Sequence, residues 1–403
     1  MAKLPLEGIR IADFSWVIVA PYCTQWLAIM GAEVIRIESS VHLDILRRLP
    51  PFPDGIPGTN RSGLYNSLNM SKKSCTLDLT KPRAVELAKE IVRKSDIVVE
   101  QFGYGMMEKI GLGYDVLKEL KEGLILVSAS GLGRSGPECD FGAYNEEFLA
   151  YSGLASITGY EGGPPEMTGG VWADYQTGTH LTLAILSALY HRSKTGKGQY
   201  IDIAMAESVM SQMPEAIMDH VMNGRKRGPS GNKDDMAAPH GCYPCSGDDK
   251  WVAIAVSTDE EWHSFCDAVG KPEWISDPRF SDFPERWKHQ EEMDKSIAEW
   301  TKKHNNIEIM EILQGAGIPA GPTFSLEEVV NNPHLKERGF YVTPNHEEVG
   351  KWILPGVPWK LSSSPLKVEG APVLGQDNEY VFCELLGVSV EEFAELVGEG
   401  VIC

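Results

Sequence analysis

Apolar and polar positions alternate near the start of the chain in a pattern that predicts a strand, a helix and a second strand. Residues 8–14 (GIRIADF) and 33–37 (EVIRI) alternate apolar and polar side chains, so both segments are predicted to be strands. Residues 21–30 are predicted to form a helix that stops at Gly31, since glycine commonly follows a helix end. These three elements predict a βαβ unit, in which the two strands run parallel.

The same alternation of strands and helices continues toward residue 130. Strands are predicted within residues 69–79, 96–100 and 124–128, with helices over 82–93 and from residue 106. This order is typical of an α/β fold with a Rossmann-like doubly wound sheet. Ligands of such sheets collect at the carboxyl ends of the strands, where Val17, Ile18, Gln101 and Phe102 are expected.

The first turn of this domain does not favour a dinucleotide cofactor. Residues 15–21 (SWVIVAP) lack the G-x-G-x-x-G pattern that lets a backbone approach a pyrophosphate. Glu38 does end the second strand, the place where a dinucleotide-binding unit holds a ribose hydroxyl. With the glycines missing, the sequence predicts a nucleotide-binding type of fold without its usual cofactor signal.

Asp174 lies shortly before a segment that is predicted to be a helix. Residues 169–178 (GGVWADYQTG) lead into a segment whose apolar positions recur every three or four residues, which predicts a helix over 179–192. Asp174 has two interpretations at this place. It can cap the helix, as aspartate often does, or it can react with a ligand that the neighbouring glycines allow to approach. The local pattern alone favours the cap.

The second half of the chain predicts a change of domain. A strand is expected at 200–205 and a long helix at 207–223, followed by a polar, glycine-rich stretch at 223–235. The predicted domains are therefore a large α/β domain at 1–222, a linker with a small α+β domain at 223–330, and a return to the large domain at 331–403.

Composition excludes several classes of partner. A net charge of −20 disfavours binding to nucleic acid or to an anionic membrane surface. The eight cysteines follow no disulfide framework, and the lone C-x-x-C pair Cys242 and Cys245 is interpreted as reduced structural thiols rather than a redox or metal site. No metal is expected. The N-terminus has no signal-peptide layout and no long apolar run occurs, so a cytoplasmic protein is expected.

Five blocks of sequence resemble the class III CoA-transferase family, also called CaiB/BaiF or formyl-CoA transferase-like. They are LPLEGIRIADFS with GAEVIRIE, LNMSKKSCTLDL, VVEQFGYGMMEKIGLGYDVL, ADYQTGTHLTLAILSALYHRSKTGKGQYIDIAMAES, and GIPAGPTFSLEEVVNNPHLKERG with PVLGQDNEYV. They occur in the family's order over nearly the whole chain. The resemblance implies an interlocked dimer, either a homodimer or a heterodimer with a related subunit, and coenzyme A as part of the substrate.

The resemblance also implies roles for particular residues. The family's catalytic aspartate matches Asp174, which would attack an acyl-CoA thioester, form a mixed anhydride and then an aspartyl-CoA thioester. Lys109 stands where an arginine near the ADP phosphates is common, which keeps the charge but loses the planar fork. The positions implied to contact coenzyme A are Ile18, Val19, Ser39, Leu77, Gln101, Phe102, Gly103, Lys109, Tyr144 and Asn145.

Two departures from the family's pattern concern the coenzyme and the substrate. Ser39 stands where arginine or proline is frequent, which changes one nucleotide contact. Residues 234–241 stand in place of the glycine-rich loop of formyl-CoA transferases, which disfavours oxalate and formate exchange. The substrates favoured instead are succinyl-CoA as donor, with an aromatic succinate such as benzylsuccinate, or a carnitine-like acid, as acceptor. Two alternatives stay open: an α-methylacyl-CoA racemase-like enzyme, whose histidine would fall at Tyr144, and a non-catalytic partner subunit.

Overall fold

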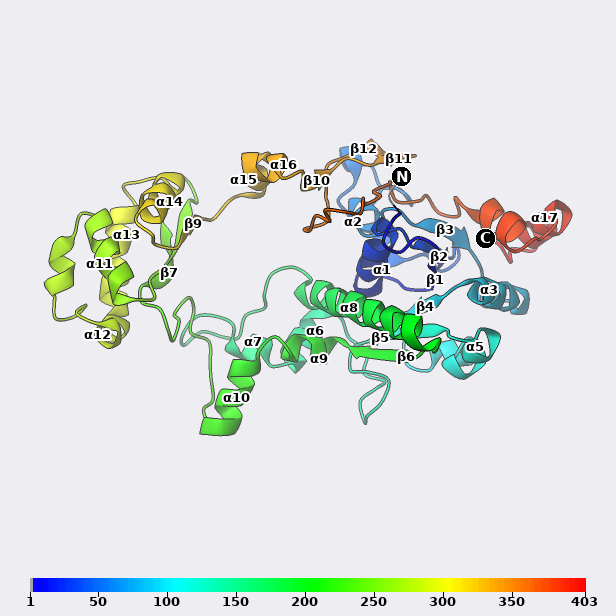
Figure 1. Cartoon of the computed structure of the whole chain (residues 1–403), viewed down its shortest axis with the longest axis horizontal. Helices are drawn as coiled ribbons and strands as arrows, with labels where there is room; N and C mark the ends of the chain where they lie inside the picture. The colour runs from blue at the N-terminus through cyan, green and yellow to red at the C-terminus, as the bar shows by residue number, and fades with distance from the viewer. Residues whose placement is uncertain (1–2) are drawn as a thin grey trace. The chain divides into compact units, whose positions relative to one another are not determined.

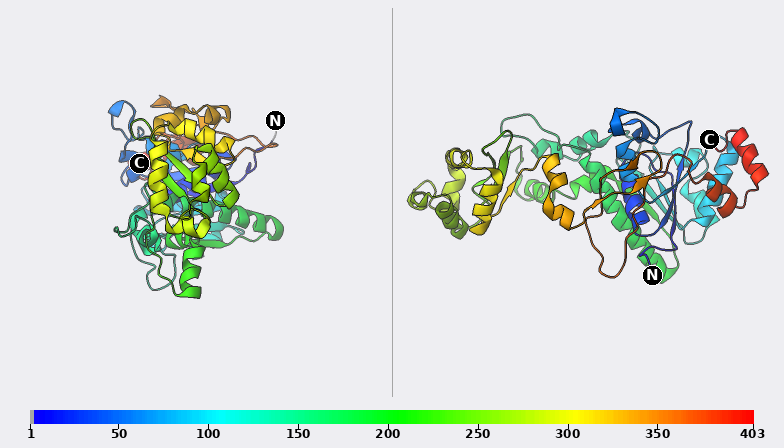
Figure 2. Two further views of the ribbon diagram at one scale, coloured as in Figure 1. Left: turned by 90° about the vertical axis from the view of Figure 1, so that its left-hand side faces the viewer. Right: turned by 90° about the horizontal axis from the view of Figure 1, so that it is seen from above.

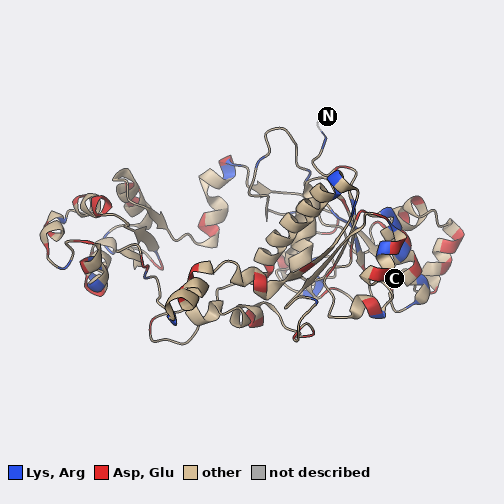
Figure 3. Ribbon diagram, turned by 60° about the horizontal axis from the view of Figure 1, so that its bottom comes forward, with Lys and Arg blue, Asp and Glu red and all other residues tan. Residues whose placement is uncertain are grey.

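The computed structural model describes residues 3–403, which divide into two compact units. The first unit contains the chain up to Ala155, Met167–Arg225 and Gly339–Cys403. The second contains Ser156–Glu166 and Lys226–Arg338. Acidic residues are spread over the helices of both units (Figure 3). None of the helices in the described part of the chain is both long and apolar enough to span a membrane.

A parallel six-stranded sheet forms the centre of the first unit (Figure 1). Its strands have the spatial order β3-β2-β1-β4-β5-β6. The chain therefore moves outward from β1 to β3 and then starts again at β4 on the other side of β1, which makes a topological switch point between β1 and β4. The strands are β1 (Arg10–Asp13), β2 (Glu33–Glu38), β3 (Lys73–Thr76), β4 (Ile97–Glu100), β5 (Ile125–Ser130) and β6 (Tyr200–Ala204).

Helices cover both faces of this sheet, because successive side chains of each strand point to opposite faces. Ile11 of β1 packs in the core that holds α1 and α8, whereas the adjacent Ala12 packs in the core that holds α3, α5 and α17. The expected doubly wound α/β fold is confirmed. The helices of this unit are α1 (Val19–Ile29), α2 (Gly63–Leu68), α3 (Pro82–Lys94), α4 (Met106–Lys109), α5 (Tyr114–Leu120), α6 (Asn145–Tyr151), α8 (Trp172–Thr195), α9 (Met205–Met210), α10 (Pro214–Asn223) and α17 (Val390–Gly398).

One predicted helix is wrong. The segment expected as a single helix over 207–223 forms two helices, α9 and α10, with a break at residues 211–213. Pro214 is the first residue of α10. Proline lacks a backbone N–H and clashes with the preceding turn, so it begins a helix readily but interrupts one that is already running.

The C-terminal segment returns to the edge of the sheet. The free side of edge strand β3 donates Ser74 N–H to the Asp377 carboxylate and Thr76 N–H to the Asn378 side-chain carbonyl, at 2.9 and 2.8 Å. These side chains satisfy backbone groups that an edge strand otherwise leaves open. Beyond them lie a π-helix (Tyr380–Leu385) and α17, which shares a core cluster and an ion pair with α3 and lies near it in Figure 1 and in the right-hand view of Figure 2.

Short elements complete this unit. Two 3₁₀ turns lie between β2 and α2. Two small hairpins follow where the chain re-enters the unit. These elements are the turns Ile45–Arg48 and Pro53–Gly55, β10 (Tyr341–Val342) paired with β13 (Leu354–Pro355), and β11 (Asn345–His346) paired with β12 (Gly350–Lys351). The first crossing to the second unit falls within α7 (Leu154–Ile157), between Ala155 and Ser156.

The second unit is a small α+β body with an antiparallel sheet of order β7-β8-β9. Its core contains Trp262, Phe265 and Phe280. The Cys242 and Cys245 thiols contact different partners, Thr323 Oγ1 and the Tyr243 carbonyl, and both are free. Its elements are β7 (His240–Pro244), β8 (Trp251–Ala255), β9 (Ala320–Pro322), α11 (Asp259–Ala268), a 3₁₀ turn (Pro272–Ser276), α12 (Phe283–Lys288), α13 (Gln290–Thr301), α14 (Asn306–Gly315), α15 (Leu326–Asn331) and α16 (Pro333–Glu337).

Candidate active site

A cavity of about 840 Å³ lies at the carboxyl ends of four neighbouring strands. Its walls include Trp16 after β1, Ser39 after β2, Leu77 after β3 and Phe102 after β4. The switch point between β1 and β4 thus lies at this cavity, where open α/β sheets bind their ligands. Four of the predicted coenzyme contacts line it: Ser39, Leu77, Phe102 and Lys109.

The walls of this cavity are mainly apolar, with basic side chains among them. Trp16 meets Phe102 edge-on, with ring centroids 6.1 Å apart, and Leu77 is fully buried beneath them. Lys109 is exposed, whereas Lys89 pairs with Glu86. Apolar walls with a few polar groups suit a flat base, and an unpaired lysine suits a phosphate. Trp16 was not among the predicted contacts, although an aromatic residue directly after the first strand is a usable signal.

Ser39 supports the turn that follows β2. Its Oγ accepts the backbone N–H groups of Val41 and His42 at 3.2 and 3.3 Å and lies 3.3 Å from the Cys403 thiol. The hydroxyl is therefore already engaged in shaping the cavity rim. Its contact with a coenzyme stays a prediction.

Glu38 does not have the role of a ribose-binding acid. Its buried carboxylate accepts hydrogen bonds from Arg47, Tyr65 and Ser74 at 2.8 to 2.9 Å. Burial alone would raise the pKa of Glu38, but Arg47 and the other donors hold it at about 2. With both oxygens hydrogen-bonded inside the protein, Glu38 at the wall of the cavity holds Arg47, Tyr65 and Ser74 in place and is not an unoccupied acid waiting for a ribose. This agrees with the missing dinucleotide signal.

The turn between β1 and α1 has a strained backbone. Val17 has a φ angle of +62°, which is unusual for a β-branched residue and costs about 1–3 kcal/mol. Its N–H donates to the Asp44 carboxylate at 3.2 Å, and Asp44 in turn forms a buried ion pair with Arg36. This turn places Ile18 at the N-cap of α1. The hydrogen bond from Val17 to Asp44 could not be predicted from the sequence of the turn, because Asp44 lies 27 residues away.

Gln101 fixes the first turn of α1 against the end of β4. Its side-chain carbonyl accepts the N–H of Ala20 at 3.1 Å. Val19, the first residue of α1, is fully buried. Gln101 therefore holds the start of α1, formed by its N-cap Ile18 and by Val19, at the carboxyl end of β4.

Helix α8 packs very closely against the start of α1. A Cβ atom at Gly178 would lie 2.6 Å from the Val19 carbonyl oxygen and 3.0 Å from the Tyr22 ring, so only glycine fits there. Tyr175 meets Tyr22 edge-on at 4.9 Å. Val171 and Tyr175 also pack with Val17 and Ile18 in one apolar cluster. The first turn of α8 therefore lies beside the strained β1–α1 turn.

Asp174 is the third residue of α8 and is 7% exposed. Val171 occupies the N-cap position and no side-chain capping bond is formed, so the interpretation of Asp174 as a helix cap is wrong. Its own backbone N–H donates a hydrogen bond to the carboxylate, which lowers the pKa of Asp174 but does not offset the two effects that raise it. Burial, followed by repulsion from Glu146, raises the pKa of Asp174 from 3.8 to about 7. A buried carboxyl with such a raised pKa is a candidate functional group.

Asn145 supplies the cap that α8 lacks locally. Its Oδ1 accepts the N–H of Ala173 at 2.9 Å, and its Nδ2 donates to the Gly170 carbonyl at 3.3 Å. Gly170 has a φ angle of +73°, a conformation that glycine adopts without strain. The side chain of Asn145 thus holds the loop in front of Asp174. Its predicted contact with a coenzyme stays a prediction.

The structure brings the predicted residues together in two groups. One group lines the cavity, and the other surrounds Asp174 and the start of α1. Gly103 and Tyr144 are exposed and line neither, with Tyr144 72% exposed at the start of α6. The segment from Trp16 to Val19 connects the groups, because Trp16 lines the cavity and the next residues pack against α8.

This fold and site define a doubly wound α/β protein with a cavity at the carboxyl ends of its strands and a buried carboxyl group at the start of α8. Comparison with known proteins then gives the family. Residues 6–378 match CoA-transferase family III. The chain belongs to this family and is a CoA-transferase, as the sequence blocks indicate.

Relatives carry several substrate names. The chain is 34% identical to the formyl-CoA:oxalate CoA-transferase of Streptomyces coelicolor, covering 100% of both chains. It is 32% identical to the succinyl-CoA–D-citramalate CoA-transferase of Chloroflexus aurantiacus, covering 99% of this chain and 98% of the relative. It is 33% identical to the succinyl-CoA–L-malate CoA-transferase beta subunit of that organism, with coverage of 99% and 98%.

A solved structure shows the same fold. The crystal structure of a CaiB/BaiF family protein from Brucella suis has a TM-score of 0.85 and 28% identity, and the match covers 96% of this chain and 100% of that one.

Proposed function

We propose that Asp174 is the nucleophile that carries an acyl group and then coenzyme A between two carboxylic acids. The observation that supports this most is the buried carboxyl of Asp174, whose pKa is raised to about 7, in the first turn of a helix that packs against the residues after Trp16. The cavity would take the adenosine end of coenzyme A, with Lys109 near its phosphates. The pantetheine arm would follow residues 17–19 toward α8.

The proposed exchange conserves the energy of the thioester. An oxygen of Asp174 attacks the thioester carbonyl, the carbon–sulfur bond breaks, and coenzyme A leaves as a thiolate. The thiolate then attacks the Asp174 carbon of the mixed anhydride, releasing the donor acid and leaving an aspartyl-CoA thioester. The acceptor carboxylate attacks that thioester, and the thiolate finally attacks the acceptor carbonyl, which restores the Asp174 carboxylate.

The surroundings of Asp174 suit this chemistry. A pKa of about 7 means that a substantial fraction of Asp174 is ionised at neutral pH, while its basicity exceeds that of an ordinary carboxylate. The N-terminus of α8 favours negative charge on the reacting oxygens. Backbone N–H groups near Gly169 and Gly170 are candidate donors to the oxyanion of each tetrahedral intermediate.

Succinyl-CoA is the proposed donor, and an aromatic succinate such as benzylsuccinate is the proposed acceptor, with a carnitine-like acid as the second choice. Tyr22, Tyr175, Val17 and Val171 form an aromatic and apolar cluster around the start of α8, which suits an apolar substituent. Two relatives are also named for succinyl-CoA. A dimer, either of two copies or with a related subunit, is part of the proposal, as is a cytoplasmic location for a chain whose eight cysteines are free.

The nucleophile is tested by trapping. The enzyme is incubated with succinyl-CoA and hydroxylamine, and the peptide containing Asp174 is analysed by mass spectrometry. An aspartyl hydroxamate at Asp174 is expected. Asp174→Ala is expected to abolish exchange while it still binds coenzyme A. The exposed Asp140 provides a matched control, since Asp140→Asn should exchange normally. Full activity of Asp174→Ala would end the assignment.

The substrates are tested separately with a panel. Donors are succinyl-CoA and formyl-CoA, and acceptors are oxalate, malate, citramalate, benzylsuccinate and carnitine. The highest kcat/KM is expected for succinyl-CoA with benzylsuccinate. A clear preference for formyl-CoA with oxalate would refute the substrate proposal and leave the role of Asp174 intact.

A further inference from the structure

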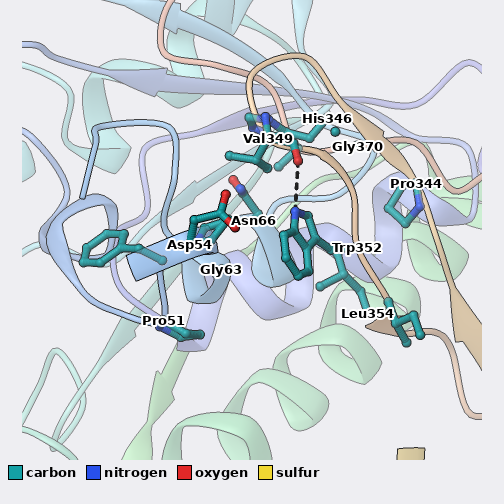
Figure 4. A pocket seen from close by; sticks show the side chains of 15 residues that line it. Pro51, Asp54, Gly63, Asn66, Pro344, His346, Val349, Trp352, Leu354 and Gly370 are labelled. Carbon is teal, nitrogen blue, oxygen red and sulfur yellow. Dashed lines mark hydrogen bonds between the residues drawn. The ribbon is translucent and has the colours of Figure 1, made fainter. Parts of the chain in front are cut away.

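A second cavity lies in the first unit, between the 3₁₀ turn at Pro53–Gly55, α2 and the C-terminal hairpins (Figure 4). Its volume is about 340 Å³, within the range of small-molecule sites. Within residues 3–403, the residues that line it and those that line the coenzyme cavity are different sets. Nothing in the proposed transfer reaction uses it.

Apolar side chains form most of its wall, among them Phe52, Trp352, Ile353 and Leu354. The indole N–H of Trp352 donates to the Val349 carbonyl at 2.9 Å, the bond drawn as a dashed line in Figure 4. The polar atom of this ring is therefore satisfied, and its surface is available for apolar contact. Trp352 and Ile353 are both about half exposed, so the cavity opens to solvent.

Two buried polar atoms belong to residues of this wall and lack a hydrogen-bond partner: His346 Nε2 and Asn66 Oδ1. Their residues are only 5% and 6% exposed. An unmade bond on a buried polar atom is costly, so such atoms usually have a partner. A ligand in this cavity would supply both.

The hydrogen-bonding role of each atom follows from its neighbours. His346 Nδ1 accepts the backbone N–H groups of Glu348 and Val349 at 3.1 and 3.2 Å, so the ring proton lies on Nε2, which is a donor. Burial lowers the pKa of His346, which keeps the ring neutral. The Asn66 Nδ2 donates to the Asn60 carbonyl at 3.3 Å, which leaves Oδ1 as an acceptor.

The charges of the wall point to a neutral occupant. Asp54 is the charged residue among the described lining residues, and no lysine or arginine is among them. A carboxylate entering here would lose water without gaining a cation. The carboxylic acids that a CoA-transferase exchanges are therefore poor ligands for this cavity.

We propose that this cavity binds a small, neutral, mainly apolar molecule with a hydroxyl or amide group, which accepts a hydrogen bond from His346 Nε2 and donates one to Asn66 Oδ1. Aromatic alcohols and primary amides have this combination. Ala371 both lines the cavity and packs in the cluster of Ile18 and Tyr175. The occupant thus contacts the apolar cluster that surrounds the start of α8.

The test measures binding of 2-naphthol and of its anionic counterpart, 2-naphthoate, to the full chain by calorimetry. We expect 2-naphthol to bind at least tenfold more tightly than 2-naphthoate. His346→Phe and Asn66→Leu should each lower the affinity for 2-naphthol about tenfold, which is the effect of losing one buried hydrogen bond. His334→Phe, at an exposed histidine, should leave binding unchanged.

His346→Phe and Asn66→Leu change buried residues and could unfold the protein, so a variant at an exposed position provides a second test. Ile353 is 56% exposed, so Ile353→Arg should fold normally and supply the missing cation at the cavity mouth. This variant should bind 2-naphthol more weakly and 2-naphthoate more tightly than the wild type does. The proposal is overturned if the wild type does not bind 2-naphthol, if 2-naphthoate binds equally well, or if Ile353→Arg leaves the preference unchanged.

Discussion

The raised pKa of Asp174 lowers the stability of the folded protein at neutral pH, and replacing Asp174 with asparagine should remove this loss. Asparagine has nearly the same shape as aspartate but does not titrate, so Asp174→Asn should leave the packing of α8 in place. In the wild type, the unfolded chain releases the Asp174 proton near pH 3.8, whereas the folded protein holds it until about pH 7. Between these values the native state binds more protons than the unfolded state, so the free energy of unfolding falls as pH rises.

The size of this effect follows from the two pKa values. The slope is about 1.4 kcal/mol per pH unit, and the full difference between 3.8 and about 7 amounts to about 4 kcal/mol. Aggregation near the isoelectric point limits the usable range. When the pH rises from about 5.5 to about 8, the linkage relation predicts that titration of Asp174 lowers the free energy of unfolding of the wild type by about 2 kcal/mol.

The measurement is urea unfolding of both proteins at these two pH values. The stability advantage of Asp174→Asn over the wild type should be about 2 kcal/mol larger at about pH 8 than at about pH 5.5. Asp140→Asn, which changes an exposed carboxylate, should show no such change with pH. If the stability advantage of Asp174→Asn is the same at both pH values, the pKa of the Asp174 carboxyl is not raised in the folded protein and the reasoning fails.

Three further results are expected. kcat/KM should rise with pH through about 7 as Asp174 ionises, and Glu146→Gln should move this rise to lower pH because it removes a repelling charge. Gly178→Ala should destabilise the protein by about 1–3 kcal/mol in urea unfolding, because the new Cβ meets the Val19 carbonyl. Lys109→Ala should weaken coenzyme A binding several-fold in a direct titration, and the loss should shrink at high salt.

Matched variants separate these effects from general damage. Glu119→Gln and Lys197→Ala change exposed charges outside both cavity linings and should behave as the wild type. Gly315→Ala, in a helix where a Cβ meets no neighbour, should be neutral or mildly stabilising. An unshifted pH profile in Glu146→Gln, a stable Gly178→Ala or unchanged coenzyme affinity in Lys109→Ala would each contradict the corresponding expectation.

Local patterns predict the elements of the sheet well. The βαβ unit at the start of the chain and the part of α8 over 179–192 both follow from spacings of two to four residues, which are properties of the backbone itself, whereas the part of α8 before residue 179 is not predicted. The carboxyl-end cavity follows from strand order, because parallel strands present the same ends at one edge. Phe102 and Leu77 line it for this reason.

Long-range partners are what the sequence does not reveal. Asn145 caps α8 from 28 positions upstream, and Asp44 holds the strained Val17 from 27 positions downstream. Asparagine and aspartate occur at many turns, so their types alone say nothing of these bonds. The raised pKa of Asp174 likewise depends on its burial and on the nearby charge of Glu146, which lies 28 positions upstream and cannot be inferred from local spacing.

The bonds from Asp377 and Asn378 to β3 have a consequence for biosynthesis. A ribosome releases the N-terminal strands long before these two residues exist, so during translation β3 stays open to pairing with neighbouring nascent chains. A gene shortened before these codons, or an N-terminal half expressed alone, should therefore yield insoluble material rather than a working coenzyme-binding module.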